Sequence, residues 1–216
     1  MPFQSRRGLT QFLQFACDNS HLLPDERTQL VKQLPLRFQA TAVLLPFDWQ
    51  DNGNACVWLT QRSNHLPHHA GQIAFPGGKV VAEDSSHLAA ALRETQEELG
   101  VSPENWQIIG QLPVCYLPSG FAVTPFVALY QSKSADSPVW QPNPAEVTAV
   151  FSLPLHIALD TQHYRTEMVV HQQYRLPVYH LHFEQYDIWG ATAAMLYQLA
   201  QNNAHRLPEP ETKTYR

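Results

Sequence analysis

The sequence predicts a single mixed α/β domain, and three observations along its 216 residues support this expectation. Residues 9–16 and 25–34 carry apolar side chains at helical spacing, ahead of a β-rich region that begins near Phe38. A carboxylate-rich helical pattern between Asp84 and Gly100 then interrupts the β-rich region. A hydrophobic content of 44% suits one globular core in a chain of this length.

The two N-terminal patterns predict short helices that cap the main fold. Residues 9–16 read LTQFLQFA, and residues 25–34 read DERTQLVKQL. The C-terminal end, RLPEPETKTYR, is polar and proline-bearing, which is typical of a disordered tail. We therefore divide the chain into an N-terminal helical extension at 1–36, a main domain at 37–201 and a disordered tail at 202–216.

The β-rich region predicts a hairpin followed by further strands. The apolar runs QATAVLLPF and ACVWLTQ flank residues 51–54, and the Asn-Gly pair in this DNGN segment is a strong signal for a tight turn. The last apolar pattern, from Asp187 to Leu199, has helical spacing and predicts a helix. Four runs between them are interpreted as strands: WQIIGQL, FAVTPFVALY, EVTAVFSL and PVYHLHF.

Composition and charge limit the classes of function. The formal net charge is −5 with a pI near 6.1, and no Lys/Arg block could neutralise a run of nucleic-acid phosphates. Cys17, Cys56 and Cys115 are odd in number and widely spaced, which predicts neither a disulfide framework nor a CxxC site. No signal peptide or membrane-spanning apolar stretch is recognisable. We expect a soluble cytoplasmic protein that binds neither nucleic acid nor membrane, and a phosphate ester ligand would need local cations.

The helical pattern after the hairpin has recognisable ends and a buried stripe. Asp84 or Ser85 is the expected N-cap, and Gly100 is expected at the C′ position. The stripe expected to face the core comprises Leu88, Ala91, Leu92, Thr95 and Leu99.

Three acidic side chains share the other face of this helix. Glu94, Glu97 and Glu98 are spaced i, i+3 and i, i+4, and each like-charge pair costs roughly 0.2–0.5 kcal/mol. A solvated charged face is the simplest explanation of such a run. The helix has no lysine, however, and its one cation, Arg93, pairs with Glu97 only in the weaker Arg-before-Glu order. This deficit favours an external hard cation such as Mg²⁺ or Mn²⁺.

The segment GGKVVAEDSSHLAAALRETQEELGV resembles the Nudix box, Gly-x5-Glu-x7-Arg-Glu-apolar-x-Glu-Glu-x-Gly-apolar. This segment is one residue longer than the box before Arg93, which leaves the first acid open between Glu83 and Asp84. Thr95 also replaces the usual apolar residue. The remaining motif positions match at Gly78, Arg93, Glu94, Glu97, Glu98 and Gly100.

The resemblance implies a Nudix-type α/β/α sandwich with a mixed sheet, here with added N-terminal helices. It implies that Glu94 and Glu98 are metal ligands, and that Glu97 is a third ligand or orients the attacking water. Arg93 would hold a carboxylate in position rather than contact the substrate. Bound Mg²⁺ or Mn²⁺ would activate water and neutralise the pyrophosphate, which is then hydrolysed.

The preceding segment, LTQRSNHLPHHAGQIAFPGG, resembles the signature of the coenzyme A pyrophosphatase branch, and resemblance to this branch extends over roughly residues 38–200. Pro67 stands where the branch has an arginine that could contact a phosphate, and His68 is a partial substitute. Positions that agree with the signature are Arg62, Ser63, Leu66, His69, Gly71, Gln72, Phe75, Pro76, Gly77 and Gly78.

The branch resemblance supplies further candidate residues. Glu146, in PAEV, is either a distant ligand or general base, or an ordinary glutamate at a strand edge. The candidate catalytic residues are therefore Arg93, Glu97, Glu98 and Glu146. The candidate substrate contacts are Arg62, Gln72, Lys79, Gly77 and Gly78.

These residues lead to one hypothesis and several rivals. The leading hypothesis is hydrolysis of coenzyme A or its thioesters to adenosine 3′,5′-bisphosphate and 4′-phosphopantetheine products. ADP-ribose or a dinucleotide is the alternative substrate class, and a non-catalytic nucleotide-sensing module is the alternative of another class. An isomerase on the same fold would need a catalytic cysteine, for which no motif is present. Homo-oligomerisation stays open.

Two residue clusters do not decide the chemistry. His65, His68 and His69 resemble part of a zinc site, but no cysteine or second histidine pair completes four ligands. Four aromatic residues include possible adenine-stacking rings, although aromatic residues on β-rich runs usually belong to the core: Tyr116, Phe121, Trp140 and Trp189.

Overall fold

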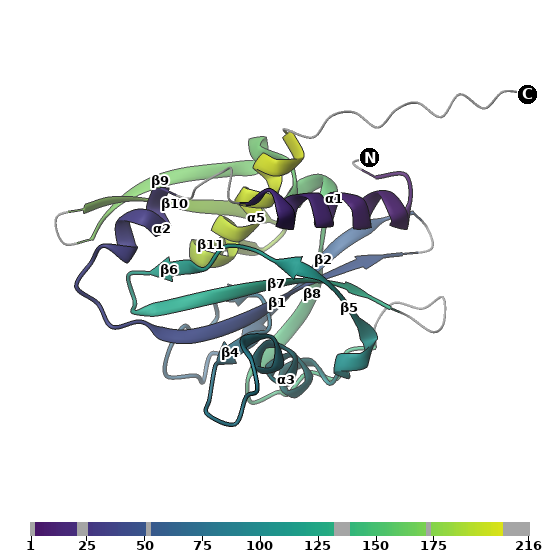
Figure 1. Ribbon diagram of the computed structural model, residues 1–216, viewed down its shortest axis with the longest axis horizontal. Helices are drawn as coiled ribbons and strands as arrows, with labels where there is room; N and C mark the ends of the chain where they lie inside the picture. The colour runs from purple at the N-terminus through teal and green to yellow at the C-terminus, as the bar shows by residue number, and fades with distance from the viewer. Residues whose placement is uncertain (1–2, 21–25, 51–52, 132–138, 172–173, 205–216) are drawn as a thin grey trace, which may run out of the picture.

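The computed structural model describes residues 3–20, 26–50, 53–131, 139–171 and 174–204. Within these ranges the chain forms two β-sheets with helices on both sides of the larger one (Figure 1). The mixed α/β fold expected from the sequence is confirmed.

The larger sheet contains eight strands: β1 (Gln39–Trp49), β2 (Ala55–Arg62), β3 (Ile73–Ala74), β4 (Gly77–Lys79), β5 (Trp106–Gln111), β6 (Cys115–Leu117), β7 (Phe121–Tyr130) and β8 (Val147–Pro154). Its main order is β3-β2-β1-β7-β5, with β8 beside β2, β4 beside β1 and β6 beside β7. The β1 and β7 strands run parallel, whereas the other pairs are antiparallel, so the sheet is mixed as expected.

The smaller sheet has the order β11-β10-β9 and is entirely antiparallel. Its strands are β9 (Tyr164–His171), β10 (Tyr174–Phe183) and β11 (Tyr186–Trp189). The helices within the described residues are α1 (Arg6–Asp18), α2 (Glu26–Lys32), α3 (His87–Leu99), α4 (Leu155–Ala158) and α5 (Gly190–Ala204), with 3-10 turns at Pro103–Asn105 and Thr161–His163.

Strand β1 shows how the layers arise from alternation, because successive side chains of a strand point to opposite faces. Ala42 and Leu44 are fully buried in the cluster that contains α3, whereas Leu45 and Phe47 are fully buried in the cluster that contains α1 and α5. Figure 1 shows the same three layers, with α3 below the large sheet and α1, α5 and the small sheet above it.

The predicted hairpin is confirmed. The β1 and β2 strands pair antiparallel, with Phe47 opposite Val57 and Trp49 opposite Ala55. Gly53 has φ +78°, and its N–H donates to the Gln50 carbonyl at 2.9 Å. Residues 51 and 52, which complete the predicted Asn-Gly turn, lie outside the described residues.

Helix α1 begins at the cap of Ser5, whose hydroxyl accepts a hydrogen bond from the Gly8 N–H at 3.1 Å. Its apolar residues Leu9, Phe12 and Leu13 are buried in the same cluster as the β1 and β2 strands. The first helix expected from the sequence is therefore present and shares the core of the main domain. The α2 helix covers the central part of the second expected helix.

The N-cap of α3 was predicted incorrectly. Ser86, rather than Asp84 or Ser85, accepts a hydrogen bond from the Ala89 N–H at 3.0 Å. Asp84 instead accepts hydrogen bonds from the Arg93 side chain and from the Val81 N–H. Gly100 ends the helix with φ +72°, as expected for a left-handed position.

The start of the last helix was also predicted incorrectly. Residues 187–189 belong to β11, and α5 begins only at Gly190. Ile188 is fully buried as expected, but as a strand residue opposite the buried Leu181 of β10. Gly190 has φ +68°, which turns the chain from strand to helix. The α5 helix continues to Ala204, and the remainder of the expected tail lies outside the described residues.

Candidate active site

Glu98 is the most buried carboxylate of the acidic helix. It is only 4% exposed, because it lies one turn beyond Thr95 on the side of α3 that packs against the sheet. Its Oε2 accepts a hydrogen bond from the Gly77 N–H at 3.2 Å, and its Oε1 lies 3.7 Å from the Arg62 guanidinium. Burial raises the pKa of Glu98 to about 8, although Gly77 and Arg62 act in the opposite direction. This burial was not expected from the sequence, which grouped Glu98 with Glu94 and Glu97 on the face away from the core.

Glycine at position 77 allows the backbone to reach Glu98. Gly77 has φ +150°, and a Cβ there would meet the Ala42 carbonyl and approach Val43 Cα to 2.6 Å. Because Gly77 has no side chain, the start of β4 can pack closely against β1. The Gly77 N–H is then available to the Glu98 carboxylate.

Glu94 lies against the second glycine of β4. A Cβ on Gly78 would overlap the Glu94 carboxylate, so the two residues are in direct van der Waals contact. Burial raises the pKa of Glu94, whereas the Arg93 guanidinium beside it lowers the pKa. The negative charges of the Glu97 and Glu146 carboxylates raise the pKa of Glu94 further.

Arg93 organises the outer side of the carboxylate group. Its guanidinium donates to both oxygens of Asp84 at 2.9 and 3.0 Å, and to Glu94 at 3.0 Å and Glu97 at 3.2 Å. The hydrogen bonds from Arg93 are the main reason that the pKa of Asp84 is lowered. Asp84, and not the exposed Glu83, is therefore the acid that faces the Arg93 side chain.

The loop before β8 brings Glu146 to the same place. The Asn143 N–H donates to the Glu98 carbonyl at 3.0 Å, and the Glu146 N–H donates to the Asn143 carbonyl at 3.0 Å. This chain of hydrogen bonds fixes the loop to the end of α3. The Glu146 carboxylate raises the pKa of both Glu94 and Glu98, which places it on their side of the helix.

The acidic helix has more internal cations than the sequence led us to expect. Glu98 has an internal cation, Arg62, and Arg93 contacts three carboxylates rather than Glu97 alone. When all groups are ionised, these two cations still leave three negative charges without compensation among them. Four of the five carboxylates form ion pairs with Arg62 or Arg93, namely Asp84, Glu94, Glu97 and Glu98, and the fifth, Glu146, is an electrostatic neighbour of Glu94 and Glu98.

The donor set fits a hard divalent cation. Among the described residues, no three His, Cys, Asp or Glu side chains already converge closely enough to hold an ion. Nevertheless Glu94, Glu98 and Glu146 are neighbouring carboxylates with oxygen donors, and the glycines at positions 77 and 78 let the β4 backbone contact Glu98 and Glu94 directly. Mg²⁺ and Mn²⁺ prefer such ligands, and Mg²⁺ retains several waters that can complete its coordination. Glu97 differs from the other three because its side chain is 54% exposed.

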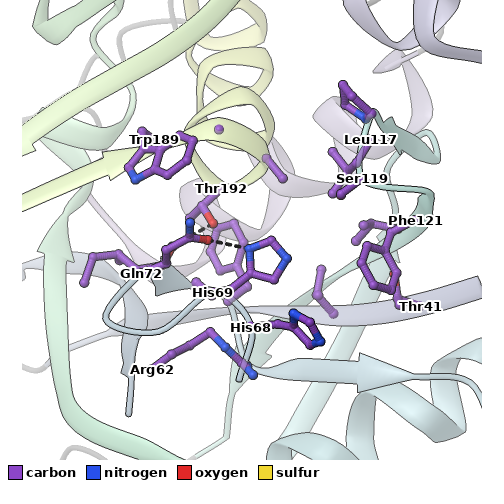
Figure 2. Close-up of a pocket in the computed structure, with 18 of the residues that line it drawn as sticks. Thr41, Arg62, His68, His69, Gln72, Leu117, Ser119, Phe121, Trp189 and Thr192 are labelled. Atoms are coloured by element: carbon purple, nitrogen blue, oxygen red, sulfur yellow. Dashed lines mark hydrogen bonds between the residues drawn. The ribbon is translucent and has the colours of Figure 1, made fainter. Parts of the chain in front are cut away.

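A cavity of about 660 Å³ opens beside the carboxylates (Figure 2). It lies between the large sheet, the 66–72 loop and the small sheet, and it has the size of a ligand pocket. Arg62 links the two regions, because it lines the cavity and also contacts Glu98. The structure brings all five predicted substrate contacts to this cavity: Arg62, Gln72, Gly77, Gly78 and Lys79.

The structure also separates the undecided histidine and aromatic residues. Phe121 and Trp189 line the cavity, whereas Tyr116 packs on Phe38 and Trp140 packs on two other tryptophans. Two histidines, at positions 68 and 69, line the cavity as well (Figure 2). His69 Nδ1 lies 2.8 Å from Gln72 Oε1, which fixes the orientation of both side chains. His65 does not line the cavity.

The three cysteines are not placed for catalysis. All three are buried, and none lines the cavity. Burial raises the pKa of Cys17 and of Cys56 to about 12, so neither thiol forms a thiolate near neutral pH. A cysteine-dependent isomerase has no support here.

Several cavity residues carry no recognisable signal in the sequence. The cavity is lined by Arg27 of α2, His171 of β9 and Leu176 of β10. These elements reach the cavity only through packing between segments that lie far apart in the sequence. A motif within one segment cannot reveal such residues. No helix in the described part of the chain is long and apolar enough to cross a membrane.

Comparisons with known proteins show what the chain is similar to. A model of the NUDIX domain matches residues 37–172. The uncharacterized Nudix hydrolase NudL of Pectobacterium atrosepticum is 42% identical over 142 residues, which cover 66% of this chain and 72% of the relative. NudL of Salmonella newport gives the same identity and coverage. A solved MutT/nudix family protein from Enterococcus faecalis aligns with a TM-score of 0.49 and 16% identity, over 94% of this chain and 76% of that one.

Proposed function

The chain belongs to the Nudix domain family, and from this premise we propose that it hydrolyses the pyrophosphate bond of coenzyme A or its thioesters with Mg²⁺ or Mn²⁺. The products are adenosine 3′,5′-bisphosphate and the 4′-phosphopantetheine portion. The observation that carries the proposal is the buried Glu98, held beside Glu94 and Glu146 at the edge of a cavity. Nudix hydrolases act on nucleoside diphosphate derivatives, and coenzyme A is one of these.

The metal site in this proposal consists of Glu94, Glu98 and Glu146, with Glu97 as an outer residue that orients water. Bound divalent ions would neutralise the diphosphate and lower the pKa of the attacking water. Glu98 must ionise to bind an ion, and the Gly77 N–H holds its carboxylate in place. Arg93 keeps Glu94 and Glu97 in fixed positions and does not line the cavity.

Arg62 and Lys79 bind the diphosphate in this proposal. Arg62 lies at the junction of the cavity and the carboxylates, and its buried Nε–H has no acceptor within the described residues. A buried guanidinium donor of this kind is well suited to a phosphate oxygen. Lys79 follows the two glycines of β4 and is exposed at the cavity. Phe121 and Trp189 offer aromatic rings to the adenine base.

A second substrate class, ADP-ribose or a dinucleotide, is favoured by one observation. Pro67 lines the cavity at the position where the coenzyme A branch has an arginine, so a phosphate contact is missing there. Turnover with a panel of coenzyme A, acetyl-coenzyme A, ADP-ribose and diadenosine compounds separates the two classes. We expect coenzyme A to have the highest kcat/KM, and rapid cleavage of ADP-ribose with inert coenzyme A would overturn the assignment.

A further inference from the structure

The cavity has a charge opposite to that of the whole protein. Three cationic residues, Arg27, Arg62 and Lys79, line it together with three histidines, and none of the described residues in its wall is acidic. The chain as a whole carries a formal charge of −5. A positively lined cavity in an acidic protein selects anionic ligands, because the field inside it is focused by the apolar walls.

The cations lie in two separate parts of the cavity. Arg62 and Lys79 are next to the carboxylates, since Arg62 contacts Glu98 and Lys79 follows Gly78 in β4. Arg27 instead belongs to α2, whose Val31 packs with Leu176 of the small sheet. Figure 1 shows α2 beside β6 and β10, well separated from β4 and α3. A ligand that reaches both groups must therefore carry two separated anionic groups.

Arg27 is a buried arginine that comes from outside the matched family domain. It is 6% exposed, whereas the NUDIX match begins only at residue 37. Away from bulk water a charge-assisted hydrogen bond from a guanidinium to a phosphate is stronger than on an exposed surface. Pro67 lines the same cavity and offers no charge. Arg27 thus brings to the cavity a positive charge that position 67 does not supply.

We propose that Arg27 is a specificity-determining residue, which binds a phosphate monoester of the substrate that is separate from the diphosphate. The substrate class is then a nucleoside diphosphate derivative with a phosphorylated ribose, while Arg62 and Lys79 contact the diphosphate. The apolar residues between the two ends, such as Leu117, cover the nucleoside. This inference rests on the proposed function, because it assigns the far end of the same substrate.

The test compares coenzyme A with 3′-dephospho-coenzyme A, which differ only in the phosphate monoester. Arg27→Gln should raise the KM for coenzyme A roughly tenfold to hundredfold and leave the KM for the dephospho compound within about twofold. Arg27→Lys keeps the charge without the planar fork, and it should lose part of the selectivity. Arg175→Gln is the matched control, because Arg175 is exposed on β10 and does not line the cavity.

A binding measurement separates failure of this inference from failure of the proposed function. Calorimetric titration with adenosine 3′,5′-bisphosphate and with AMP requires no turnover, so it applies even if the protein cleaves neither substrate. The measurement uses an Arg27 variant whose Tm is unchanged. Weaker binding of adenosine 3′,5′-bisphosphate with unchanged binding of AMP supports the inference. Equal changes for both ligands, or no change, overturn it. Wild-type protein that cleaves no nucleoside diphosphate derivative with either metal overturns the proposed function instead.

Discussion

The two ends of the cavity differ in how their chemistry is encoded. At the carboxylate end, Arg93, Glu94 and Glu98 come from one helix, and the glycines that contact them lie less than 25 residues earlier in the chain. At the far end, Arg27 comes from α2 and Leu176 comes from β10 of the small sheet, and these two elements meet only by tertiary packing. Local sequence therefore specifies the carboxylate end of the cavity. The tertiary fold, in contrast, determines which ligand fits into the far end.

Glu98→Gln should have the largest effect, because it removes a proposed metal ligand from the carboxylate end. Loss of several kcal/mol of electrostatic stabilisation corresponds to a decrease in kcat of about 10³-fold. The fold should persist, since glutamine can still accept the hydrogen bond from the Gly77 N–H. Steady-state kinetics and circular dichroism check both parts, and Glu83→Gln is the exposed control. Wild-type activity in Glu98→Gln would refute the role of this carboxylate, whereas absence of turnover in the wild type would favour a nucleotide-sensing module.

The same residue should make the stability of the metal-free protein depend on pH. Glu98 has a folded pKa of about 8 against an ordinary value of 4.5, so only the native state retains the proton between these values. Stability should therefore fall as pH rises from about 4.5 to about 8, on the order of 1.4 kcal/mol per pH unit. Thermal unfolding in EDTA measures this slope. Glu98→Gln should lack it, and Mn²⁺ should restore the Tm of the wild type above pH 8. Parallel pH profiles for both proteins would contradict the assigned burial.

Arg93→Lys should have an intermediate effect. Lysine keeps the charge but cannot donate simultaneously to both Asp84 oxygens, to Glu94 and to Glu97. Loss of such a supporting residue typically costs about 10–100-fold in metal affinity or activity. The apparent Mn²⁺ affinity, measured from the metal dependence of kcat, should weaken, while the KM for substrate changes little. If instead only KM rises, Arg93 contacts substrate directly.

Trp189→Leu should have the smallest effect, because it changes the cavity wall and leaves the carboxylates intact. Trp189 is 42% exposed and lines the cavity, so its ring can contact the base of a nucleotide. Loss of base stacking is worth about 1–3 kcal/mol, which should raise KM at least several-fold with kcat nearly unchanged. Val139→Ala, at an exposed apolar residue outside the cavity, is the control. A large loss of kcat in Trp189→Leu would show that the two ends of the cavity are not independent.

The sequence predicted elements better than it predicted which side chains are buried. The hairpin, the acidic helix and its Gly100 terminus were recognisable because turn residues and helical periodicity act locally. Ser86 was missed as the N-cap because Asp84 is also a good capping residue. Only the fold shows that the Asp84 carboxylate is bound to Arg93 instead. Ile188 fitted the helical pattern although it lies in a strand. A single buried residue directly before a helix is compatible with both the two-residue period of a strand and the 3.6-residue period of a helix.

For the site, the sequence identified the chemistry but not the environment. The spacing of Glu98 from Ala91 and Thr95 was compatible with burial, yet a glutamate is rarely placed in a core without a partner. That partner, Arg62, lies 36 positions earlier and meets Glu98 only because β2, β4 and α3 pack together. Arg27 was not predictable for the same reason, since α2 reaches the cavity through its contacts with the small sheet.

The most direct test of the central claim is anomalous diffraction from crystals of the Glu97→Gln variant soaked with Mn²⁺ and coenzyme A. That substitution removes the outer carboxylate and should slow turnover, but it leaves Glu94, Glu98 and Glu146 in place. We predict Mn²⁺ peaks between the Glu94 and Glu98 carboxylates, on the side facing Glu146 and the cavity. Coenzyme A bound in the cavity with no Mn²⁺ near these carboxylates, and with the contact between Arg62 and Glu98 unchanged, would contradict the account.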